Sequence, residues 1–384
     1  MKKLKILIIP SWYPNEKDPL WGNYFIKQAE ALSLYADVSM LYVNRMGLRE
    51  LSKIRKNKYT DGYDDKKYCF KFYKKTIINY RSFSLDFSYR RYAKEGYKAY
   101  KVLELFTGKP DVILVESALP AGLIAEYIRE KEGIPFVVHA HSEGIITNPV
   151  YEKYTKMVMK DADKYMAVNN SIKSLIEKNR KDCALVPNFI DCKKFDVENK
   201  KYKDFTLVSV SNFYKIKAID ILLKAMDIVV NKKKHKNIKL KIVGTGEYKS
   251  FYESVSKSLK LENNVEFLGY VENDSLPEIL SKSHALCVSS TFETFCIPIV
   301  EALSSGIPVI TTDCVGPLEI VNKTNSIVTP INNIEKYADS IINMYNNYDK
   351  FNSKKIKKYA IDNYDKSVIC KKIIDICNDA IIKK

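Results

Sequence analysis

Residues 285–311 read ALCVSSTFETFCIPIVEALSSGIPVIT, and this stretch decides the fold class. Two short runs rich in Val and Ile, Ala285–Val288 and Pro308–Thr311, flank a segment with helical spacing. Pro298 suits the first position of a helix and Gly306 suits the position just past its end, so the segment predicts a helix of about eight residues. A strand, a helix and a second strand of this length form a βαβ unit, which predicts a parallel sheet.

The same alternation continues along the chain in two series, which predicts two domains. The first series of expected strands is Lys5–Pro10, Val38–Val43, Asp111–Val115, Phe136–His139, Lys164–Val168 and Ala184–Val186. The second series is Thr206–Val210, Lys239–Val243, Val265–Leu268, Ala285–Val288, Pro308–Thr311 and Ser326–Val328. The charged stretch Cys192–Asp204 interrupts both periodicities. We therefore expect an α/β protein with two Rossmann-like parallel-sheet domains, residues 1–195 and 196–364, that face each other across a cleft.

Composition excludes several classes of protein. Hydrophobic residues make up 46% of the 384 residues and charged residues 28%, which is typical of globular chains. No apolar run reaches the roughly 18 residues of a membrane span. The eight cysteines are scattered without a C-x-x-C pair, which predicts neither a zinc site nor a disulfide framework and favours reduced thiols in the cytoplasm.

The net charge of +17 requires an explanation. Only 8 of the 63 basic residues are Arg, which favours lysine-biased composition over nucleic-acid recognition, because bidentate phosphate and base contacts depend on Arg. From Arg45 to Lys101, 17 basic residues stand against 6 acidic ones and are interleaved with 13 aromatic residues. This stretch suits an anionic membrane surface, and a solvated helical face over a tyrosine-rich core is the equal alternative.

Glu293 and Glu301 are the first candidate site residues. Glu293 precedes the expected helix and Glu301 lies in or just past its first turn, so both can face one pocket at the helix N-terminus, where unpaired N–H groups favour a phosphate. Carboxylates accept hydrogen bonds from the hydroxyls of a sugar or ribose, and we expect Glu293 to contact substrate rather than protein groups. Acidic pairs at this spacing arise by chance about five times in such a chain, so the spacing alone is a weak signal.

Lys217 is the second candidate. It follows the expected strand Thr206–Val210 and is expected to open a helix with an apolar stripe. A Lys in the first turn opposes the helix dipole at a cost of about 0.3–1 kcal/mol, so a polyanionic ligand is the economical explanation. An exposed Lys without a ligand is the competing interpretation.

The first half supplies candidates for the other side of the cleft. Gly22 lies at a strand-to-helix turn whose N–H groups suit a diphosphate. His139 and His141 share one face if their strand continues through both, and His139 is expected to be a structural, hydrogen-bonded histidine. Glu116 follows a strand and is an acceptor-side candidate, with capping of the next helix as the alternative.

The sequence resembles the retaining glycosyltransferases of family 4 over nearly its whole length. Glu293 and Glu301 match the E-x7-E motif of that family. The other matching segments, in family order, are Ser11–Pro14 with Gly22 and Gln28–Leu32, Val186–Asp191 with Phe195, Val243–Glu247, Phe267–Tyr270 and Gly316–Val321. Each segment is loose alone, and together they form a strong signal.

The resemblance implies the GT-B fold, with a helix over about residues 365–384 packed back on the first domain, and transfer with retention from a nucleoside-diphosphate sugar. It implies that Lys217 binds the donor diphosphate, with Asn212 at the position where the family usually has Arg. It also implies that His141 lies beside the donor sugar, which Glu293 fixes while Glu301 holds the ribose.

The donor-phosphate loop contains Phe295, Cys296 and Ile297 as further donor-binding candidates. Cys296, Val315 and Ala218 each replace a Gly that is usual in the family. The change at Cys296 is expected to alter this loop, because Gly permits a backbone approach that a Cβ atom forbids.

We therefore expect a glycosyltransferase of the hexosyltransferase type. Its donor is expected to be a sugar linked to a nucleoside diphosphate, UDP above all. Its acceptor is expected to be a hydroxyl of a glycan or of a polyprenyl-diphosphate-linked molecule, in bacterial capsule, exopolysaccharide or lipopolysaccharide synthesis. We expect a cytoplasmic protein that can attach to the inner leaflet of the plasma membrane.

No metal or other cofactor is expected, because Lys and N–H donors replace it, and no nucleic-acid partner is expected. The alternatives are a nucleotide-sugar epimerase or a phosphorylase of the same fold, and a non-catalytic basic protein that binds membranes or nucleic acid. The sequence leaves the base, the sugar and the acceptor unnamed.

Overall fold

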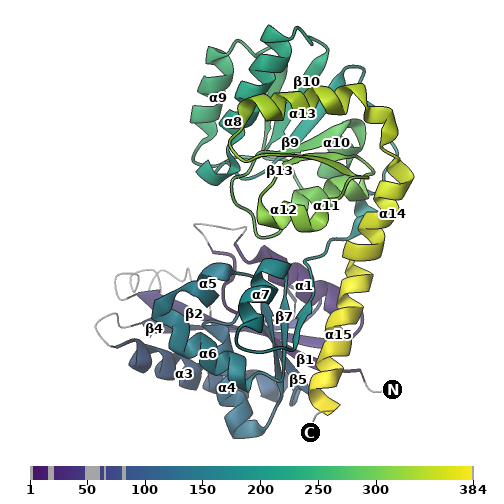
Figure 1. The fold of residues 1–384 in the computed structure, drawn as a ribbon. Helices are drawn as coiled ribbons and strands as arrows, with labels where there is room; N and C mark the ends of the chain where they lie inside the picture. The colour runs from purple at the N-terminus through teal and green to yellow at the C-terminus, as the bar shows by residue number, and fades with distance from the viewer. Residues whose placement is uncertain (1–2, 16–20, 48–60, 65, 80–83, 383–384) are drawn as a thin grey trace. The chain divides into compact units, whose positions relative to one another are not determined.

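The structure is a computed structural model that describes residues 3–15, 21–47, 61–64, 66–79 and 84–382. The chain divides into two compact units (Figure 1). Unit 1 comprises Met1–Val186 and Cys370–Lys384, and unit 2 comprises Pro187–Ile369. The division therefore falls before Pro187, whereas the sequence analysis placed it after residue 195.

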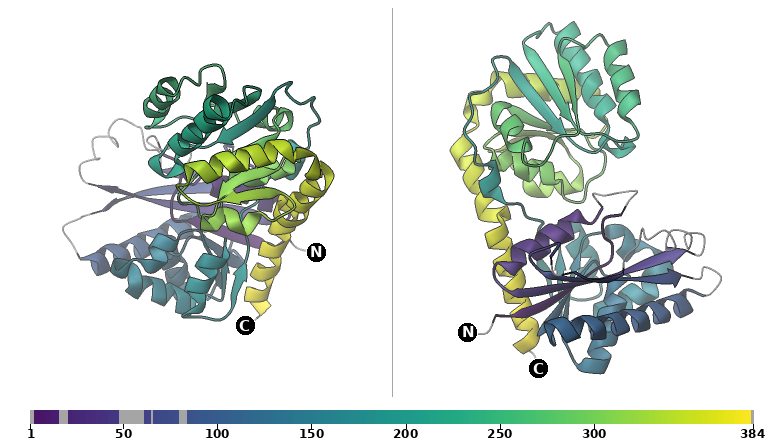
Figure 2. Two further views of the ribbon diagram at one scale, coloured as in Figure 1. Left: turned by 45° about the horizontal axis from the view of Figure 1, so that its top comes forward. Right: turned by 180° about the vertical axis from the view of Figure 1, so that it is seen from behind.

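Unit 1 is built on an eight-stranded sheet in the order β3-β4-β2-β1-β5-β6-β7-β8. Figure 2 shows the ribbon of this unit in two further views. Its strands are β1 (Lys5–Pro10), β2 (Asp37–Gly47), β3 (Gly62–Asp64), β4 (Lys71–Asn79), β5 (Val112–Glu116), β6 (Phe136–Ala140), β7 (Lys164–Ala167) and β8 (Cys183–Leu185). Every pairing is parallel except that of β3 with β4. Each strand expected in this half is present, so the prediction of a parallel sheet is confirmed.

The sequence did not predict β3 and β4, and both lie in the basic stretch Arg45–Lys101. β4 pairs in parallel with β2 from Lys71 to Asn79. The sequence of β4 is KFYKKTIIN. Its Lys residues interrupt the alternation of apolar residues that predicts a strand, so the strand was not predicted. Part of the basic stretch is therefore sheet, with Phe72 and Ile77 buried in it.

Helices cover both faces of this sheet (Figure 1). They are α1 (Asn23–Ser33), α3 (Leu85–Thr107), α4 (Ala121–Glu132), α5 (Glu143–Thr147), α6 (Glu152–Asp161) and α7 (Asn170–Glu177), with a 3₁₀ turn at Pro149–Tyr151. The largest core of unit 1 joins α3 and α4 to the strands and includes the fully buried Tyr92, Tyr100 and Ile124. The tyrosines of the basic stretch therefore supply core volume.

Unit 2 has a six-stranded, entirely parallel sheet in the order β11-β10-β9-β12-β13-β14. Its strands are β9 (Phe205–Val210), β10 (Ile238–Val243), β11 (Val265–Gly269), β12 (Ala285–Val288), β13 (Val309–Thr312) and β14 (Ser326–Thr329). Numbered along the unit, this is the 3-2-1-4-5-6 order of doubly wound sheets. The second predicted parallel-sheet domain is thus confirmed.

Two cores lie on opposite faces of this sheet, because successive strand residues point to opposite sides. Leu207 belongs to the core formed with α8 and α13, and its neighbour Val208 belongs to the core formed with α11 and α14. The helices are α8 (Ile219–Asp227), α9 (Lys249–Ser258), α10 (Leu276–Lys282), α11 (Ile297–Ser304), α12 (Val315–Ile320), α13 (Ile334–Asn346) and α14 (Ser353–Tyr364). Shorter turns are the 3₁₀ helices Cys192–Phe195, Lys215–Lys217 and Tyr348–Lys350 and the π-helix Ile228–Lys232.

The last helix, α15 (Lys366–Ile382), begins in unit 2, and its residues from Cys370 onward belong to unit 1. Cys370, Ile373, Cys377 and Ala380 are buried at helical spacing. Within the described residues, no helix has both the length and the apolar composition needed to span a bilayer.

Each sheet has one point where the strand order reverses, and open α/β sheets bind ligands at the carboxyl ends of the strands there. In unit 2 this point lies between β9 and β12, and Lys217 and Glu293 follow these two strands. In unit 1 it lies between β1 and β5, which lead to Gly22 and Glu116. The topology alone therefore brings the candidate residues of each unit to one edge of its sheet.

We expect Gly244→Ala to destabilise unit 2. Gly244 has a φ of +138°, and a Cβ atom there would lie 1.8 Å from the Ser211 carbonyl oxygen. Such overpacking costs about 1–3 kcal/mol or more. The matched control is Gly269→Ala, because Gly269 also has a positive φ, +71°, but no atom within 4 Å of the added Cβ. The urea midpoint should fall much further for Gly244→Ala, and equal falls would contradict the steric explanation.

Candidate functional site

In unit 2 the structure brings Lys217 and Glu293 together. Lys217 ends a 3₁₀ turn that follows β9, and Glu293 lies in the loop between β12 and α11. The Lys217 Nζ donates a hydrogen bond to the Glu293 Oε1 at 2.5 Å, and the side chains are 17% and 16% exposed. The Ser290 Oγ donates to the same oxygen at 3.2 Å. Hydrogen bonds to charged groups contribute about 1.5–3 kcal/mol, so this pair holds two loops in register.

Two expectations of the sequence analysis are corrected here. Glu293 was expected to have substrate partners only, but its carboxylate accepts hydrogen bonds from Lys217 and Ser290. Lys217 was expected in the first turn of a helix, but it precedes α8, because Ala218 adopts the left-handed conformation and ends the 3₁₀ turn. The helix dipole of α8 therefore does not require an anion at Lys217. The carboxylate of Glu293 is the anion that Lys217 contacts in the structure.

Backbone contacts tie the two loops together beside the ion pair. The Ser289 Oγ donates to the Lys217 carbonyl oxygen at 2.8 Å. The Thr291 N–H donates to the Ile216 carbonyl oxygen at 2.8 Å. These bonds join the loop after β12 to the turn after β9. Both segments follow the strands at which the strand order of the sheet reverses.

Three residues of this chain replace a Gly that is usual in the family, and two of them have the left-handed backbone conformation that favours glycine. Ala218 has a φ of +47° and Cys296 a φ of +81°, and they precede α8 and α11. A non-glycine residue in this conformation costs about 1–3 kcal/mol. The backbone at Cys296 adopts the left-handed conformation despite the Cβ atom, and the expectation that this residue alters the donor-phosphate loop stays a prediction.

Helix α11 begins at Ile297, with Pro298 in its first turn and Gly306, φ +76°, just past its end. The helix expected from the sequence is confirmed. Phe295 and Cys296 are buried before it, and burial raises the pKa of the Cys296 thiol well above its usual value. This thiol is therefore neutral and packs as an apolar group.

The loop before α11 also rests on the start of α12. The Gly316 N–H donates to the Glu293 carbonyl oxygen at 3.0 Å. A Cβ atom at Gly316 would lie 2.6 Å from the Phe295 nitrogen, so the loop needs glycine there. Glu301 lies in α11 and is partly buried, whereas Asn212 and Lys215 are exposed on the segment after β9. The ligand contacts proposed for Glu301 and Asn212 stay predictions.

In unit 1 the structure places Glu116 below the surface. Glu116 ends β5 and is fully buried, and its Oε1 accepts a hydrogen bond from the Gln28 Nε2 at 2.5 Å. Its Oε2 lies 2.7 Å from the His141 Nε2. Burial raises the pKa of Glu116 to about 7, while His139 and the bond from Gln28 lower it. An acceptor-side contact was expected, but the partners are protein groups, because β5 ends beneath α1.

The histidines have different environments. The buried His139 hydrogen-bonds through Nε2 to the Val186 carbonyl oxygen at 2.8 Å, and burial lowers its pKa to about 4, so it is neutral at pH 7. The expectation of a structural histidine is confirmed for His139. His141 follows β6 with an 8% exposed side chain, and the ring of Phe25 lies 5.1 Å from its ring.

Gly22 shapes the turn that precedes α1. Its φ is +82°, and a Cβ atom would lie 3.0 Å from the Trp12 carbonyl oxygen and from the Tyr13 Cα. Glycine is therefore required by the turn itself. Its proposed contact with a diphosphate stays a prediction.

Glu116, His139 and His141 are the one group in the described part of the chain with metal-ligand geometry, because their ligand atoms lie within 4.8 Å of one another. The carboxylate already has two close partners in Gln28 and His141, which favours a hydrogen-bonded network over a cation. The expectation of metal-independent chemistry stays a prediction.

Sequence reasoning missed Gln28, although a signal was present. Gln28 is fully buried in the apolar stripe of α1, between Phe25, Ala29 and Leu32. A polar residue on the buried face of a helix needs a hydrogen-bonding partner. That partner, Glu116, is 88 residues away, and the sequence does not reveal it.

Two families match this chain. The family described as "Glycosyl transferases group 1" matches residues 192–363, and "Glycosyltransferase Family 4" matches residues 58–194. An uncharacterized glycosyltransferase of Methanocaldococcus jannaschii is 27% identical over 256 residues, which are 59% of this chain and 61% of that protein. The chain thus aligns with less than two thirds of that relative's length.

Solved structures share the fold. Sucrose-phosphate synthase of Thermosynechococcus elongatus has a TM-score of 0.75 and 15% identity, with 100% of both chains covered. HepE of Anabaena, solved in complex with UDP, has a TM-score of 0.70 and 16% identity, with 97% of this chain and 99% of that chain covered. The protein therefore has the GT-B fold and consists of two domains similar to those of glycosyltransferases, including family 4.

Proposed function

We propose that this protein is a glycosyltransferase that moves a sugar from a nucleoside diphosphate to an acceptor hydroxyl with retention of configuration. The observation that carries the proposal is the Lys217–Glu293 pair at the switch point of unit 2, beside the N-terminus of α11. A cation, a carboxylate and the start of a helix together suit a sugar diphosphate.

In the proposed mechanism the leaving diphosphate is stabilised by Lys217 and by the N–H groups at the start of α11, a preorganised electrostatic site. The ammonium group has three donors, so Lys217 can keep its bond to Glu293 and still donate to a phosphate oxygen. Glu293 then accepts from hydroxyls of the donor sugar and Glu301 from the ribose. In this mechanism Lys217 lies between the Glu293 carboxylate and the donor diphosphate and reduces the repulsion between these two anionic groups.

Unit 1 contributes further residues to the proposal. His141 and Gly22 lie at the carboxyl edge of its sheet, where open α/β sheets bind ligands, and the proposal includes the exclusion of water during transfer. Water would otherwise hydrolyse the donor. No metal is required, because Lys217 and backbone N–H groups carry the positive charge.

UDP is the proposed nucleotide, and the UDP in the HepE complex supports this choice. The proposed acceptor is a glycan or polyprenyl-diphosphate-linked hydroxyl of a bacterial cell-surface polysaccharide. Thermal-shift screening of nucleotide sugars, followed by assay of nucleotide release with candidate acceptors, tests the proposal. A ligand at 100 times its Kd stabilises by about 2.7 kcal/mol, and no shift with any nucleotide would overturn it.

We expect Lys217→Ala to weaken UDP binding by about 10- to 100-fold, because a charge-assisted hydrogen bond contributes about 1.5–3 kcal/mol. Isothermal titration calorimetry measures this. Lys233→Ala is the matched control, because Lys233 is an exposed Lys of unit 2 that follows the π-helix Ile228–Lys232 and not the turn after β9. Equal affinity of Lys217→Ala and the parent for UDP would remove Lys217 from the donor site.

We expect Glu293→Gln to abolish transfer and also to lower the stability of unit 2. The amide leaves the Lys217 ammonium without its anionic partner, at a cost of about 1–3 kcal/mol. UDP should restore part of that stability, because the diphosphate supplies a new anion to Lys217. Differential scanning calorimetry with and without UDP measures both effects. Unchanged transfer by this variant would contradict the assignment.

Attachment to an anionic membrane surface is the second part of the proposal. Along α3 the exposed residues Phe87, Arg90, Lys94, Lys98 and Leu105 follow one another at helical spacing. Basic residues with apolar neighbours on one helix face suit a bilayer interface.

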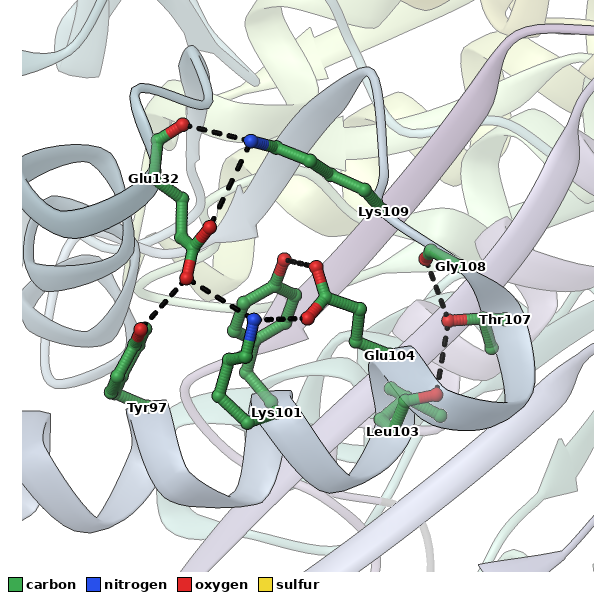
Figure 3. A network of polar contacts seen from close by, with 9 residues as sticks. Tyr97, Lys101, Leu103, Glu104, Thr107, Gly108, Lys109 and Glu132 are labelled. Carbon is green, nitrogen blue, oxygen red and sulfur yellow. Dashed lines mark hydrogen bonds and ion pairs between the residues drawn. The ribbon is translucent and has the colours of Figure 1, made fainter.

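One basic residue of the stretch, Lys101, and Lys109 just beyond it are engaged by acidic groups of unit 1. Lys101 forms ion pairs with Glu104 and Glu132, and the Lys109 Nζ lies 3.8 Å from the Glu132 Oε2 (Figure 3). Tyr97 donates to the same Glu132 carboxylate at 2.7 Å. These groups hold α3 on α4, so the proposed docking surface is the exposed face of α3 alone.

We expect the triple change Arg90→Gln, Lys94→Gln and Lys98→Gln to lower partition onto anionic vesicles by about two orders of magnitude, because each basic residue contributes about 1 kcal/mol near such a surface. The matched control neutralises Lys354, Lys355 and Lys358 on α14 of unit 2. Cosedimentation with anionic and neutral vesicles measures both.

Equal partition of these two variants, or no binding by the parent, would contradict docking through α3. The charges of residues Lys53, Arg55, Lys56 and Lys58, which the sequence analysis counts in the basic stretch, lie outside the described residues. Neutralising them provides a separate test of that segment.

A further inference from the structure

Three side chains form a buried chain of hydrogen bonds beneath the carboxyl edge of the unit 1 sheet. Gln28 of α1 donates from Nε2 to the Glu116 Oε1 at 2.5 Å. The Glu116 Oε2 lies 2.7 Å from the His141 Nε2. Gln28 and Glu116 are fully buried, and the His141 side chain is 8% exposed. The contacts join helix α1, strand β5 and the end of β6.

The donors and acceptors in this chain have only one consistent arrangement when Glu116 is ionised. An ionised carboxylate accepts hydrogen bonds and donates none. The Gln28 amide therefore donates to one oxygen, and His141 must bring a proton on Nε2 to the other. In a neutral His141 ring the proton is then on Nε2, and Nδ1 is the acceptor.

The groups around Glu116 leave this arrangement undisturbed. His139 Nδ1 lies 3.7 Å from the Glu116 Oε2, beyond hydrogen-bond distance, and His139 is neutral because its pKa is lowered to about 4. From α15, burial raises the pKa of the Cys377 thiol to about 12, so it too is neutral. The pKa of Glu116 itself is about 7, so the carboxylate is ionised at pH 8.

We propose that Glu116, oriented by Gln28, is a positioning residue that fixes His141 as the Nε2–H tautomer and so makes Nδ1 the acceptor nitrogen of the ring. That this nitrogen meets a substrate hydroxyl rests on the proposed function. Glu116 acts through His141 and touches no substrate.

Glu116→Gln tests the arrangement because it removes the charge and keeps the shape. Gln28 still donates to the oxygen of the new amide, which turns the amide NH₂ toward His141. The His141 Nε2 must then accept, and the proton moves to Nδ1. In the Ser-His-Asp triad of serine proteases, a carboxylate-to-amide change next to the histidine leaves the geometry intact but selects the wrong tautomer and lowers kcat by about 10⁴.

A swap of the two side chains, Gln28→Glu with Glu116→Gln, provides the rescue. The carboxylate introduced at position 28 attracts the amide NH₂ at position 116, and the amide oxygen turns toward His141. The Nε2–H tautomer should return, although position 116 still carries an amide. A merely structural role for Glu116 predicts no such recovery. Glu126→Gln is the control, because Glu126 of α4 is another acid whose pKa burial raises to about 7.

Nitrogen-15 NMR of histidine-labelled protein at pH 8 reads the tautomer without any substrate. The chain has four histidines, and His141→Gln assigns the His141 signals. We expect Nε2–H in the parent and in Glu126→Gln, Nδ1–H in Glu116→Gln, and Nε2–H again in the swap. Nδ1–H in the parent, the same tautomer in Glu116→Gln, or His141 signals that shift when EDTA removes a bound metal would each overturn the proposal.

Assays of sugar transfer measure how the His141 tautomer affects kcat. We expect kcat to fall at least about tenfold in Glu116→Gln and to recover in the swap, with UDP affinity unchanged because Lys217 lies in unit 2. A changed tautomer with an unchanged kcat would overturn the functional role of Glu116. If no nucleotide sugar supports transfer by the parent, the proposed function fails, while the NMR result still decides the tautomer.

Discussion

The Lys217–Glu293 ion pair is the interaction on which the organisation of unit 2 depends. It joins the turn after β9 to the loop after β12, the two segments that leave the sheet where its strand order reverses. A carboxylate and an ammonium group that are each about one sixth exposed satisfy each other without a ligand. At the proposed donor site, the free protein therefore holds these two side chains in place before a sugar diphosphate binds.

Much of the fold could be predicted from the sequence, and most of the side-chain contacts could not. The run Ile6–Pro10 of β1 is apolar and buried at every position, because parallel strands are buried on both faces. β4 was not predicted because its Lys residues interrupt the apolar pattern. The Gln28–Glu116 contact joins residues 88 positions apart and depends on how α1 lies over β5, which local periodicity does not encode. The sequence motifs identified Glu293 and Lys217 as candidate site residues, but they did not predict that the two side chains contact each other.

The overall charge of +17 has little to do with the proposed donor site. At that site one Lys faces one Glu, and an exposed Asn212 stands where the related family usually has Arg. The surplus of positive charge lies instead in the Arg45–Lys101 stretch of unit 1. Part of it serves the fold, since Lys101 is paired and β4 is an internal strand. The charge is therefore evidence about the surface of unit 1 and not about the chemistry.

The proposed donor site has little net positive charge, so in the proposed mechanism backbone N–H groups supply most of the attraction for phosphate. Their directions are set where α8 and α11 begin, and both positions carry a side chain in a left-handed conformation, Ala218 and Cys296. Each costs about 1–3 kcal/mol, which the surrounding contacts must offset. The burial of Cys296 and the Ser289–Lys217 bond are two such contacts. The strain thus lies close to the ion pair along the chain, because Ala218 directly follows Lys217 and Cys296 comes three residues after Glu293.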